Sequence, residues 1–230
     1  MNWLGLYFSS LLAALLAILP IVNPFGAVPL VMSASGHLPE QERLRQIRRA
    51  CVYTFFLMSG FLVAGGLIMN FFGISLPGMR IAGGLIVAFL GFQSFHMFVP
   101  ARMAAMTKAA GESYDIAFTP LAMPGLSGPG TFAVVMSLSS QAAARKGYLS
   151  IVDFMGVLTA IFLTALLSWF VLRGAERVNR LLGATGMVAL TRLTGFLMIS
   201  IGVQFLINGT TMIVQDPTFW SGLAEALRTS

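Results

Sequence analysis

The chain contains 230 residues, of which 57% are hydrophobic and only 10% are charged. Because soluble domains contain about 25% charged residues, this composition excludes an ordinary soluble protein and predicts an integral membrane protein. The net charge of +6 lies in short basic patches between apolar segments, which indicates membrane topology rather than nucleic-acid binding. The single cysteine excludes an intramolecular disulfide. The sequence shows no cluster of metal ligands and no nucleophile–base pair, so we expect neither a cofactor nor an enzyme.

The first apolar segment begins at Trp3 and contains no Asp, Glu, Lys or Arg before Glu40. As one helix, residues 3–35 would be about 50 Å long, whereas the hydrocarbon core is about 30 Å thick. The segment therefore has to tilt, leave the membrane or break, and Asn23-Pro24 supplies a break. It has neither the basic start nor the cleavage site of a signal peptide, so we expect it to be retained.

Five further spans follow, separated by loops that are too short to form a second domain. They are residues 50–72, 81–99, 117–138, 148–172 and 187–214. The prediction is an all-α polytopic protein with six transmembrane spans, which forms a single transmembrane domain over residues 1–230. The helices of the first and fourth spans are expected to be discontinuous.

The two halves of the chain resemble each other. Three residues of the third span recur 111 residues later, where Gly84, Gly91 and Gln93 correspond to Gly195, Gly202 and Gln204. Three spans per half force the second repeat into the membrane upside down. We therefore expect two inverted three-helix repeats, over residues 1–105 and 112–218. Chance similarity between apolar helices is the alternative.

Basic residues are divided unevenly between the two sides of a six-span topology. One side has nine in its loops, and these are Arg43, Arg45, Arg48, Arg49, Arg102, Lys108, Arg173, Arg177 and Arg180. The other side has four, and these are Arg80, Arg145, Lys146 and Arg228. Because loops rich in Lys and Arg remain in the cytoplasm, we expect both termini to face outward.

Each half contains a break that is marked by proline and glycine, at residues 20–26 and 124–131. Asn23 followed by Pro24 is typical of an N-cap and a first helical position, and Ser127 or Gly128 followed by Pro129 repeats this pattern. We expect two half-helices that begin inside the bilayer, each with unpaired N–H groups and a partial positive charge at its start. A matched pair of breaks is a pointer to the binding site of a transporter.

Two such helix starts at similar depth suit a carboxylate, and carbonyl groups before each break can accept hydrogen bonds from an ammonium group. No acidic residue lies close to either break, so the pattern favours an α-amino acid zwitterion as the ligand. The predicted substrate-binding residues are Asn23, Pro24, Gly26, Ser127, Gly128, Pro129, Gly130 and Thr131. The alternative is that neighbouring helices satisfy two ordinary kinks.

Several polar side chains in or near the spans are candidates for gating or coupling, because such groups are costly in a membrane. They are Arg80, Asp153, Arg192, Gln93 and Gln204. We expect Arg80 and Asp153 to pair near the outward ends of the third and fifth spans. The alternatives are that both extend to the interface and that the glutamines only join helices. Six glycines are expected to permit close helix packing, and these are Gly60, Gly65, Gly66, Gly83, Gly84 and Gly91.

Several motifs resemble the MarC family, in order and over nearly the whole chain. They are NPFG at residues 23–26, FTPLAMP at 118–124, GPGT at 128–131, GISLPGMRIAGGL at 73–85 and IGVQF at 201–205. The resemblance implies a six-span protein of the bacterial inner membrane. It also implies similarity to archaeal transporters of small neutral amino acids such as glycine and alanine, with proton coupling.

These inferences together predict a secondary transporter that binds a small amino acid zwitterion and moves it by alternating access. The expected partners are this solute, the lipid bilayer and protons, and no nucleic acid. The alternatives are an exporter of other small solutes or drugs, and an ion channel.

Overall fold

The computed structural model describes residues 3–36, 38–96, 115–145, 147–217 and 219–221. Four residues discussed above, Arg102, Lys108, Lys146 and Arg228, lie outside these ranges, as do parts of both predicted repeats. In the described residues all regular elements are helical. They are α1 (Trp3–Val22), α2 (Val28–Ser35), α3 (Glu40–Phe71), α4 (Leu76–Phe95), the π-helical segment η1 (Ala117–Leu126), α6 (Pro129–Ala143), α7 (Tyr148–Arg173) and α8 (Ala175–Val214).

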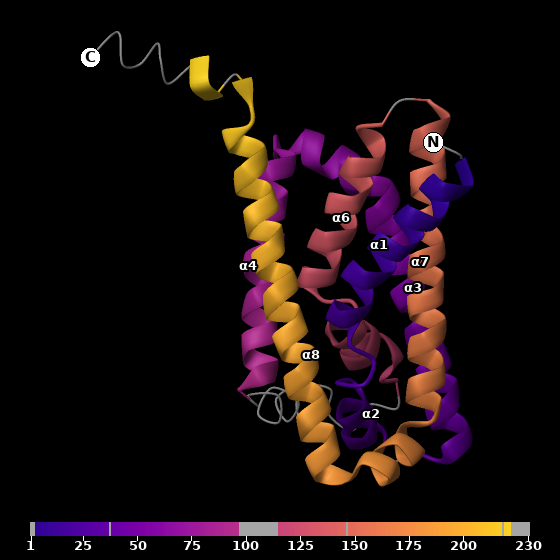
Figure 1. Ribbon diagram of the computed structural model, residues 1–230. Helices are drawn as coiled ribbons and strands as arrows, with labels where there is room; N and C mark the ends of the chain where they lie inside the picture. Colours follow the sequence, from indigo (N-terminus) through magenta and orange to yellow (C-terminus); the bar gives the residue numbers. More distant parts are fainter. Residues whose placement is uncertain (1–2, 37, 97–114, 146, 218, 222–230) are drawn as a thin grey trace.

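Five of these helices are long and apolar enough to cross a bilayer, namely α1, α3, α4, α7 and the part of α8 over Thr185–Val214. The pair of η1 and α6, bent by 63° at a short break, provides a sixth crossing if it counts as one span. The long helices run up and down along a common direction, and the start of α1 and the end of α8 lie at the same end of the molecule (Figure 1). An all-helical protein with five or six spans is therefore confirmed.

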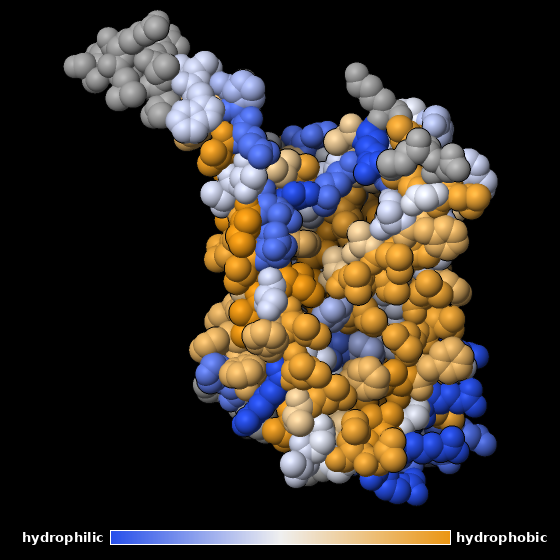
Figure 2. Space-filling model, in the orientation of Figure 1, coloured by the Kyte–Doolittle hydropathy of each residue, from blue (hydrophilic) through white to orange (hydrophobic). Residues whose placement is uncertain are grey.

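The central core is built where α1, α3 and α7 meet. The helix α7 packs against both α1 and α3, and α3 also packs against α6 and η1. Ile18, Met58 and Ile161 are fully buried between these helices. The outer surface is apolar as well, because Phe56, Val63 and Leu67 repeat along one face of α3 and are 65%, 74% and 72% exposed. An exposed apolar face of this kind is suited to contact with lipid tails, and Figure 2 shows that apolar side chains also cover most of the middle of the face toward the viewer.

A second packing unit is formed by α4 and α8, which lie side by side (Figure 1). Glycines let the two backbones approach closely: a Cβ atom on Gly84 would lie 2.6 Å from the carbonyl oxygen of Gly202. Small residues have this role at many helix interfaces in membranes. The predicted close packing is confirmed at Gly65, Gly83, Gly84 and Gly91. It is wrong at Gly60 and Gly66, where an added Cβ would meet no atom within 4 Å.

Candidate functional site

The first break begins at Asn23, directly after α1. Asn23 has a φ of +44°, in the left-handed region that Asn adopts more easily than most residues. Its N–H donates to the carbonyl of Leu19 at 3.0 Å, which closes α1. Its side-chain Oδ1 accepts from the N–H of Gly26 at 3.0 Å. Asn23 thus ends one helix and caps the turn that leads into the next.

The regular part of α2 starts later than the sequence predicts. The N-cap of α2 is Ala27 and a proline lies in its first turn. That proline is Pro29 rather than Pro24, so the predicted start at Pro24 is four residues early. The physical reason is the turn between Asn23 and Ala27, where the Ala27 N–H donates to the Asn23 carbonyl at 3.2 Å.

The second break follows the predicted pattern at the start of α6. Gly128 is the N-cap, in an extended conformation, and Pro129 is the first helical residue. Because Gly128 has no capping side chain, the N–H groups of Gly130 and Thr131 have no acceptor within the helix. Before this point η1 is interrupted by non-helical dihedral angles at Thr119 and Met123. Each of these residues precedes a proline, as expected from the clash between proline and a helical neighbour.

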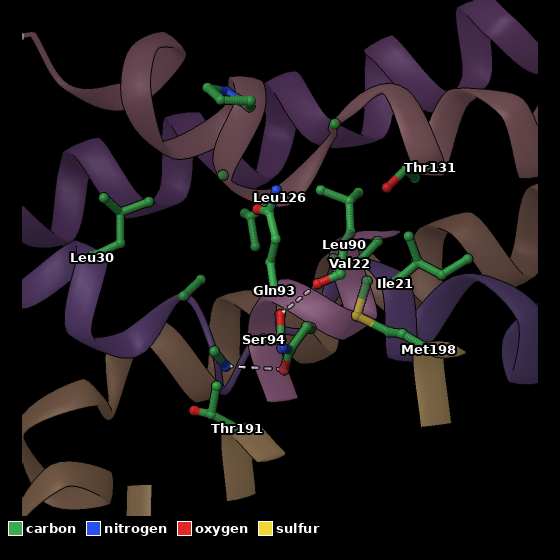
Figure 3. A pocket seen from close by; sticks show the side chains of 16 residues that line it. Ile21, Val22, Leu30, Leu90, Gln93, Ser94, Leu126, Thr131, Thr191 and Met198 are labelled. Carbon is green, nitrogen blue, oxygen red and sulfur yellow. Dashed lines mark hydrogen bonds between the residues drawn. The ribbon is translucent and has the colours of Figure 1, made fainter. Parts of the chain in front are cut away.

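Both breaks line one cavity, which α4 and α8 complete. Its volume is about 120 Å³. In Figure 3 the side chain of Gln93 extends from α4 toward the segment that contains Leu126. The lining residues are Ile21, Val22, Asn23, Gly26, Ala27, Leu30, Leu90, Gln93, Ser94, Pro124, Gly125, Leu126, Gly128, Thr131, Thr191 and Met198.

The cavity lining combines apolar walls with a few neutral polar groups. Of the described residues that line it, none carries a formal charge, and the polar side chains are those of Asn23, Gln93, Ser94, Thr131 and Thr191. Pockets for drug-sized ligands occupy about 300–1,000 Å³, so a cavity of about 120 Å³ suits a much smaller solute. Neutral polar groups and free backbone N–H groups can hydrogen-bond such a solute without a buried counter-ion.

A side-chain bridge joins the first break to α8. The Nδ2 of Asn23 donates to the Oγ1 of Thr194 at 3.2 Å. The Thr194 hydroxyl lies 3.0 Å from the carbonyl oxygens of Leu190 and Thr191, to which it can donate. Gly26 has no room for a side chain, because an added Cβ would overlap with the Asn23 amide and lie 2.8 Å from its Cγ. The first break is therefore held tightly against α8.

The predicted substrate-binding residues divide into two groups. Those that line the cavity are Asn23, Gly26, Gly128 and Thr131, and Gln93 from the predicted gating residues joins them. The others do not line it: Pro24 is buried, Pro129 is exposed, and Gly130 faces α4, where an added Cβ would lie 3.2 Å from Leu90 Cδ1. Ser127 is fully buried, and its hydroxyl has no hydrogen-bond partner among the described residues.

The predicted pair of Arg80 and Asp153 is wrong. The Oδ2 of Asp153 lies 2.6 Å from the Nε of Arg145, and Ser10 of α1 donates to the Oδ1 of the same carboxylate. Arg80 instead lies next to α8, where its Cβ is 3.3 Å from the position of a Cβ on Gly209. The two residues lie apart because their helices have different neighbours: α4 packs on α8, whereas the start of α7 packs on α1.

The remaining predicted gating residues lie on α8, outside the cavity lining. Arg192 is exposed. Gln204 is also exposed, and its Nε2 donates to the Oδ1 of Asn208 at 2.9 Å, so these two residues share a face of α8. Sequence reasoning missed the cavity residues Ser94, Thr191, Leu90, Met198 and Leu30. The available signals were the position of Leu30 shortly after the first break and the positions of the other four in the third and sixth spans, beside the repeated glycines.

An apolar bundle of helices, with two interrupted helices that meet at a small uncharged cavity, defines an integral membrane protein with an internal solute-sized site. Residues 8–214 match the family described as MarC family integral membrane protein, and the chain belongs to this family.

The chain is similar to proteins named inner membrane protein MarC from Escherichia coli strain K12, from Escherichia coli O1:K1 and from Shigella flexneri. The identity is 39% over 217 residues, which cover 90% of this chain and 97% of each relative. No solved structure matches the chain.

Proposed function

We propose that this protein is a secondary transporter that moves a small neutral amino acid, such as glycine or alanine, across the bacterial inner membrane. The observation that carries the proposal is that the helix breaks of the two halves line one cavity. Paired discontinuous helices that meet at such a site are a recurring design of transporters. The inner membrane is supported by the similarity to inner membrane proteins from enteric bacteria.

The cavity chemistry favours a zwitterion over a drug or a single ion. The start of α6 presents the backbone N–H group of Thr131, which lines the cavity, and such a helix start attracts a carboxylate. Backbone carbonyls of Ile21 and Val22, at the end of α1, are suited to an ammonium group. Both charges of the solute then find partners in a cavity whose described lining residues are uncharged.

The packing of α4 on α8 supports inverted repeats. Gly84 corresponds to Gly195 and Gly91 to Gly202, at a spacing of 111 residues. A Cβ on Gly84 would lie 2.6 Å from the Gly202 oxygen, and a Cβ on Gly91 would lie 2.7 Å from the Gly195 oxygen. Each glycine therefore contacts the counterpart of the other, which is the relation that a two-fold axis produces.

The other helix contacts agree with this relation. If α1 corresponds to η1 and α3 to α7, the contact of α1 with α7 is the counterpart of the contact of η1 with α3, and both are present. Two repeats around a central cavity provide the mechanical basis for alternating access, in which one repeat tilts against the other.

Basic residues from two distant loops support the proposed orientation. Arg43, before the second span, pairs with Glu176, after the fifth, at 2.6 Å. Both loops therefore lie at one end of the molecule, opposite the start of α1 and the end of α8 (Figure 1). Because basic loops remain in the cytoplasm, we propose that both termini face the periplasm.

Counterflow with purified protein in proteoliposomes tests the function. We expect exchange of labelled glycine and alanine by the unmodified protein. In Gly128→Ala the added Cβ lies 3.3 Å from the Pro124 oxygen and narrows the cavity, so exchange of alanine should fall more than exchange of glycine. The matched control is Gly60→Ala, where the Cβ meets no atom within 4 Å.

Two results would contradict the proposal. If the unmodified protein exchanges no amino acid but conducts ions across the same vesicles, the protein is a channel. If Gly128→Ala and Gly60→Ala exchange both amino acids at equal rates, the solute does not occupy the cavity between the breaks.

A further inference from the structure

A second hollow lies at the end of the molecule opposite the termini, where the start of α3 meets the corner between α7 and α8. Its volume is about 580 Å³. A smaller hollow of about 290 Å³ adjoins it and shares Leu44 and Arg173 with it. Neither hollow shares a lining residue with the cavity between the helix breaks. A ligand of these hollows would therefore be distinct from the transported solute.

Positive charge dominates the lining of the two hollows. Six arginines contribute to it, and these are Arg43, Arg45, Arg48, Arg173, Arg177 and Arg180. The acidic residues of the described lining are Glu40 and Glu176. A concave surface with such an excess of arginine attracts anions strongly, because its walls concentrate the field of the guanidinium groups.

Two contacts position the central guanidinium groups. Arg43 Nη2 lies 2.6 Å from Glu176 Oε1, and this pair joins the start of α3 to the start of α8. The guanidinium of Arg173 lies 5.2 Å from the ring centroid of Trp169, as in a cation–π contact. The Glu176 side chain is 53% exposed, so solvent weakens its hold on Arg43 and another anion can compete for this arginine.

The hollow lies at the boundary between the apolar and the polar surface. Phe170, one of its lining residues, is 58% exposed, and the exposed residues Leu166 and Phe162 continue the apolar face along α7. Trp169, of the kind enriched at membrane–water interfaces, lines the adjoining hollow. Figure 2 shows hydrophilic side chains gathered at this end, next to the apolar band.

We propose that the hollow binds the phosphodiester of an anionic phospholipid headgroup. Arginine presents its N–H donors in a fork that matches two phosphate oxygens. Several arginines line the hollow, so several such forks are available to one phosphate group. The volume of about 580 Å³ falls in the range that small-molecule sites occupy. The adjacent apolar face of α7 receives the acyl chains. A bound headgroup joins α3 to the α7–α8 corner and displaces Glu176 from Arg43.

Native mass spectrometry of the purified full-length protein tests this site, with phosphatidylglycerol, phosphatidylethanolamine or inorganic phosphate added separately. We expect phosphatidylglycerol to be retained in preference to phosphatidylethanolamine. Arg173→Gln/Arg177→Gln should lose this preference, and the exposed single variant Arg180→Gln should weaken it. The matched control is Arg80→Gln on α4, at the other end of the molecule, which should keep it.

A variant with the opposite expected effect separates binding from damage to the fold. Glu176→Gln removes the carboxylate that competes for Arg43, so it should retain several-fold more phosphatidylglycerol than the unmodified protein. A damaged structure would not bind more lipid. Equal retention of the two lipids, or unchanged retention in the double arginine variant, would overturn the proposal. Retention of inorganic phosphate at millimolar concentration, without retention of either lipid, would assign the hollow to a free anion and would overturn the lipid as its occupant.

Discussion

Gly91 of α4 and Gly195 of α8 face each other with almost no space between their backbones. A Cβ on Gly91 would lie 2.7 Å from the Gly195 oxygen, and a Cβ on Gly195 would lie 2.8 Å from the Gly91 oxygen. Backbone atoms cannot move aside as the end of a side chain can. The two helices therefore have to separate if either glycine is enlarged, and α4 and α8 both line the cavity.

Gly91→Ala should destabilise the protein by roughly 1–3 kcal/mol, the range for overpacked interiors. Thermal unfolding in detergent measures this change. Gly66→Ala is the matched control, because its added Cβ meets no atom within 4 Å, and it should unfold at the same temperature as the unmodified protein or above it. Equal unfolding temperatures of the two variants would show that the helices are not in close contact.

The contributions of the two hydrogen bonds of the Asn23 side chain can be distinguished by substitution. Thr194→Val removes the acceptor of the Asn23 Nδ2 and leaves the bond from Gly26 to Oδ1 intact. Asn23→Ala removes both bonds and also adds about 1–2 kcal/mol of backbone strain at positive φ. We expect Asn23→Ala to lower both stability and amino acid exchange more than Thr194→Val. Asn23→Gly, which tolerates positive φ, should recover stability but not exchange.

If Asn23→Gly restores exchange as well as stability, the amide has only a backbone role. If Thr194→Val is the more damaging of the two, the bridge to α8 matters more than the turn itself.

The sequence rules for helix starts predicted the structure correctly where neighbouring residues alone determine it. Gly128 before Pro129 predicted the start of α6 correctly, because this pair satisfies the requirements of a helix start without outside help. Asn23 followed by Pro24 has the same pattern, yet α2 starts at Val28. There the Asn23 side chain bonds to the backbone of its own turn and to Thr194 of a distant helix, and the second bond cannot be read from neighbouring residues.

The sequence could not show which helices are neighbours in the bundle. Hydropathy places Arg80 and Asp153 near the same membrane surface, but it does not show which helices are neighbours. Ser94 and Thr191 could not be predicted as cavity residues for the same reason. A single hydroxyl in a span becomes informative only when the breaks are known to face it.

Asp153 is 6% exposed, and its carboxylate depends on Arg145 and Ser10. Arg145→Gln should destabilise the protein by roughly 1–3 kcal/mol, because a buried charged group loses its strongest partner. Asp153→Asn removes the charge and retains an acceptor for Ser10, so it should cost less. Thermal unfolding of both variants checks this order.

Asp153→Asn also tests proton coupling. If Asp153 closes the outward side in a proton-linked step, Asp153→Asn should abolish the stimulation of uptake by a pH gradient while it leaves counterflow intact. Uptake that still responds fully to the gradient would exclude Asp153 from coupling.

One face of α8 is exposed and polar within a membrane span, and Ser200, Gln204 and Thr211 lie on it. Hydrocarbon does not accommodate such a face, so we expect it to contact water. Cys51, the single cysteine, is buried, and background labelling should be low. Gln204→Cys should react quickly with a membrane-impermeant thiol reagent, whereas Val203→Cys, 44% exposed in the unmodified protein among apolar neighbours, should react slowly. Equally slow reaction of both variants would place both positions in lipid and contradict the expectation.

Two buried hydroxyls without a hydrogen-bond partner among the described residues provide a matched comparison. Ser127 lies between the cavity residues Leu126 and Gly128, whereas Thr164 lies on α7 and does not line the cavity. Removal of an unsatisfied buried hydroxyl is neutral or stabilising when shape is retained, because its desolvation costs about 1–3 kcal/mol. Ser127→Ala and Thr164→Val should therefore both unfold at the same temperature as the unmodified protein or above it.

The two variants should differ in their rate of amino acid exchange. If the Ser127 hydroxyl is kept free for the solute or for a water beside it, Ser127→Ala should slow amino acid exchange several-fold although the protein becomes no less stable. Thr164→Val should exchange at the normal rate. A Ser127→Ala protein that is more stable and equally active would show that this hydroxyl contributes nothing to the site, and the polar contacts of the solute would then come from the start of α6 and from the neutral side chains of α4 and α8.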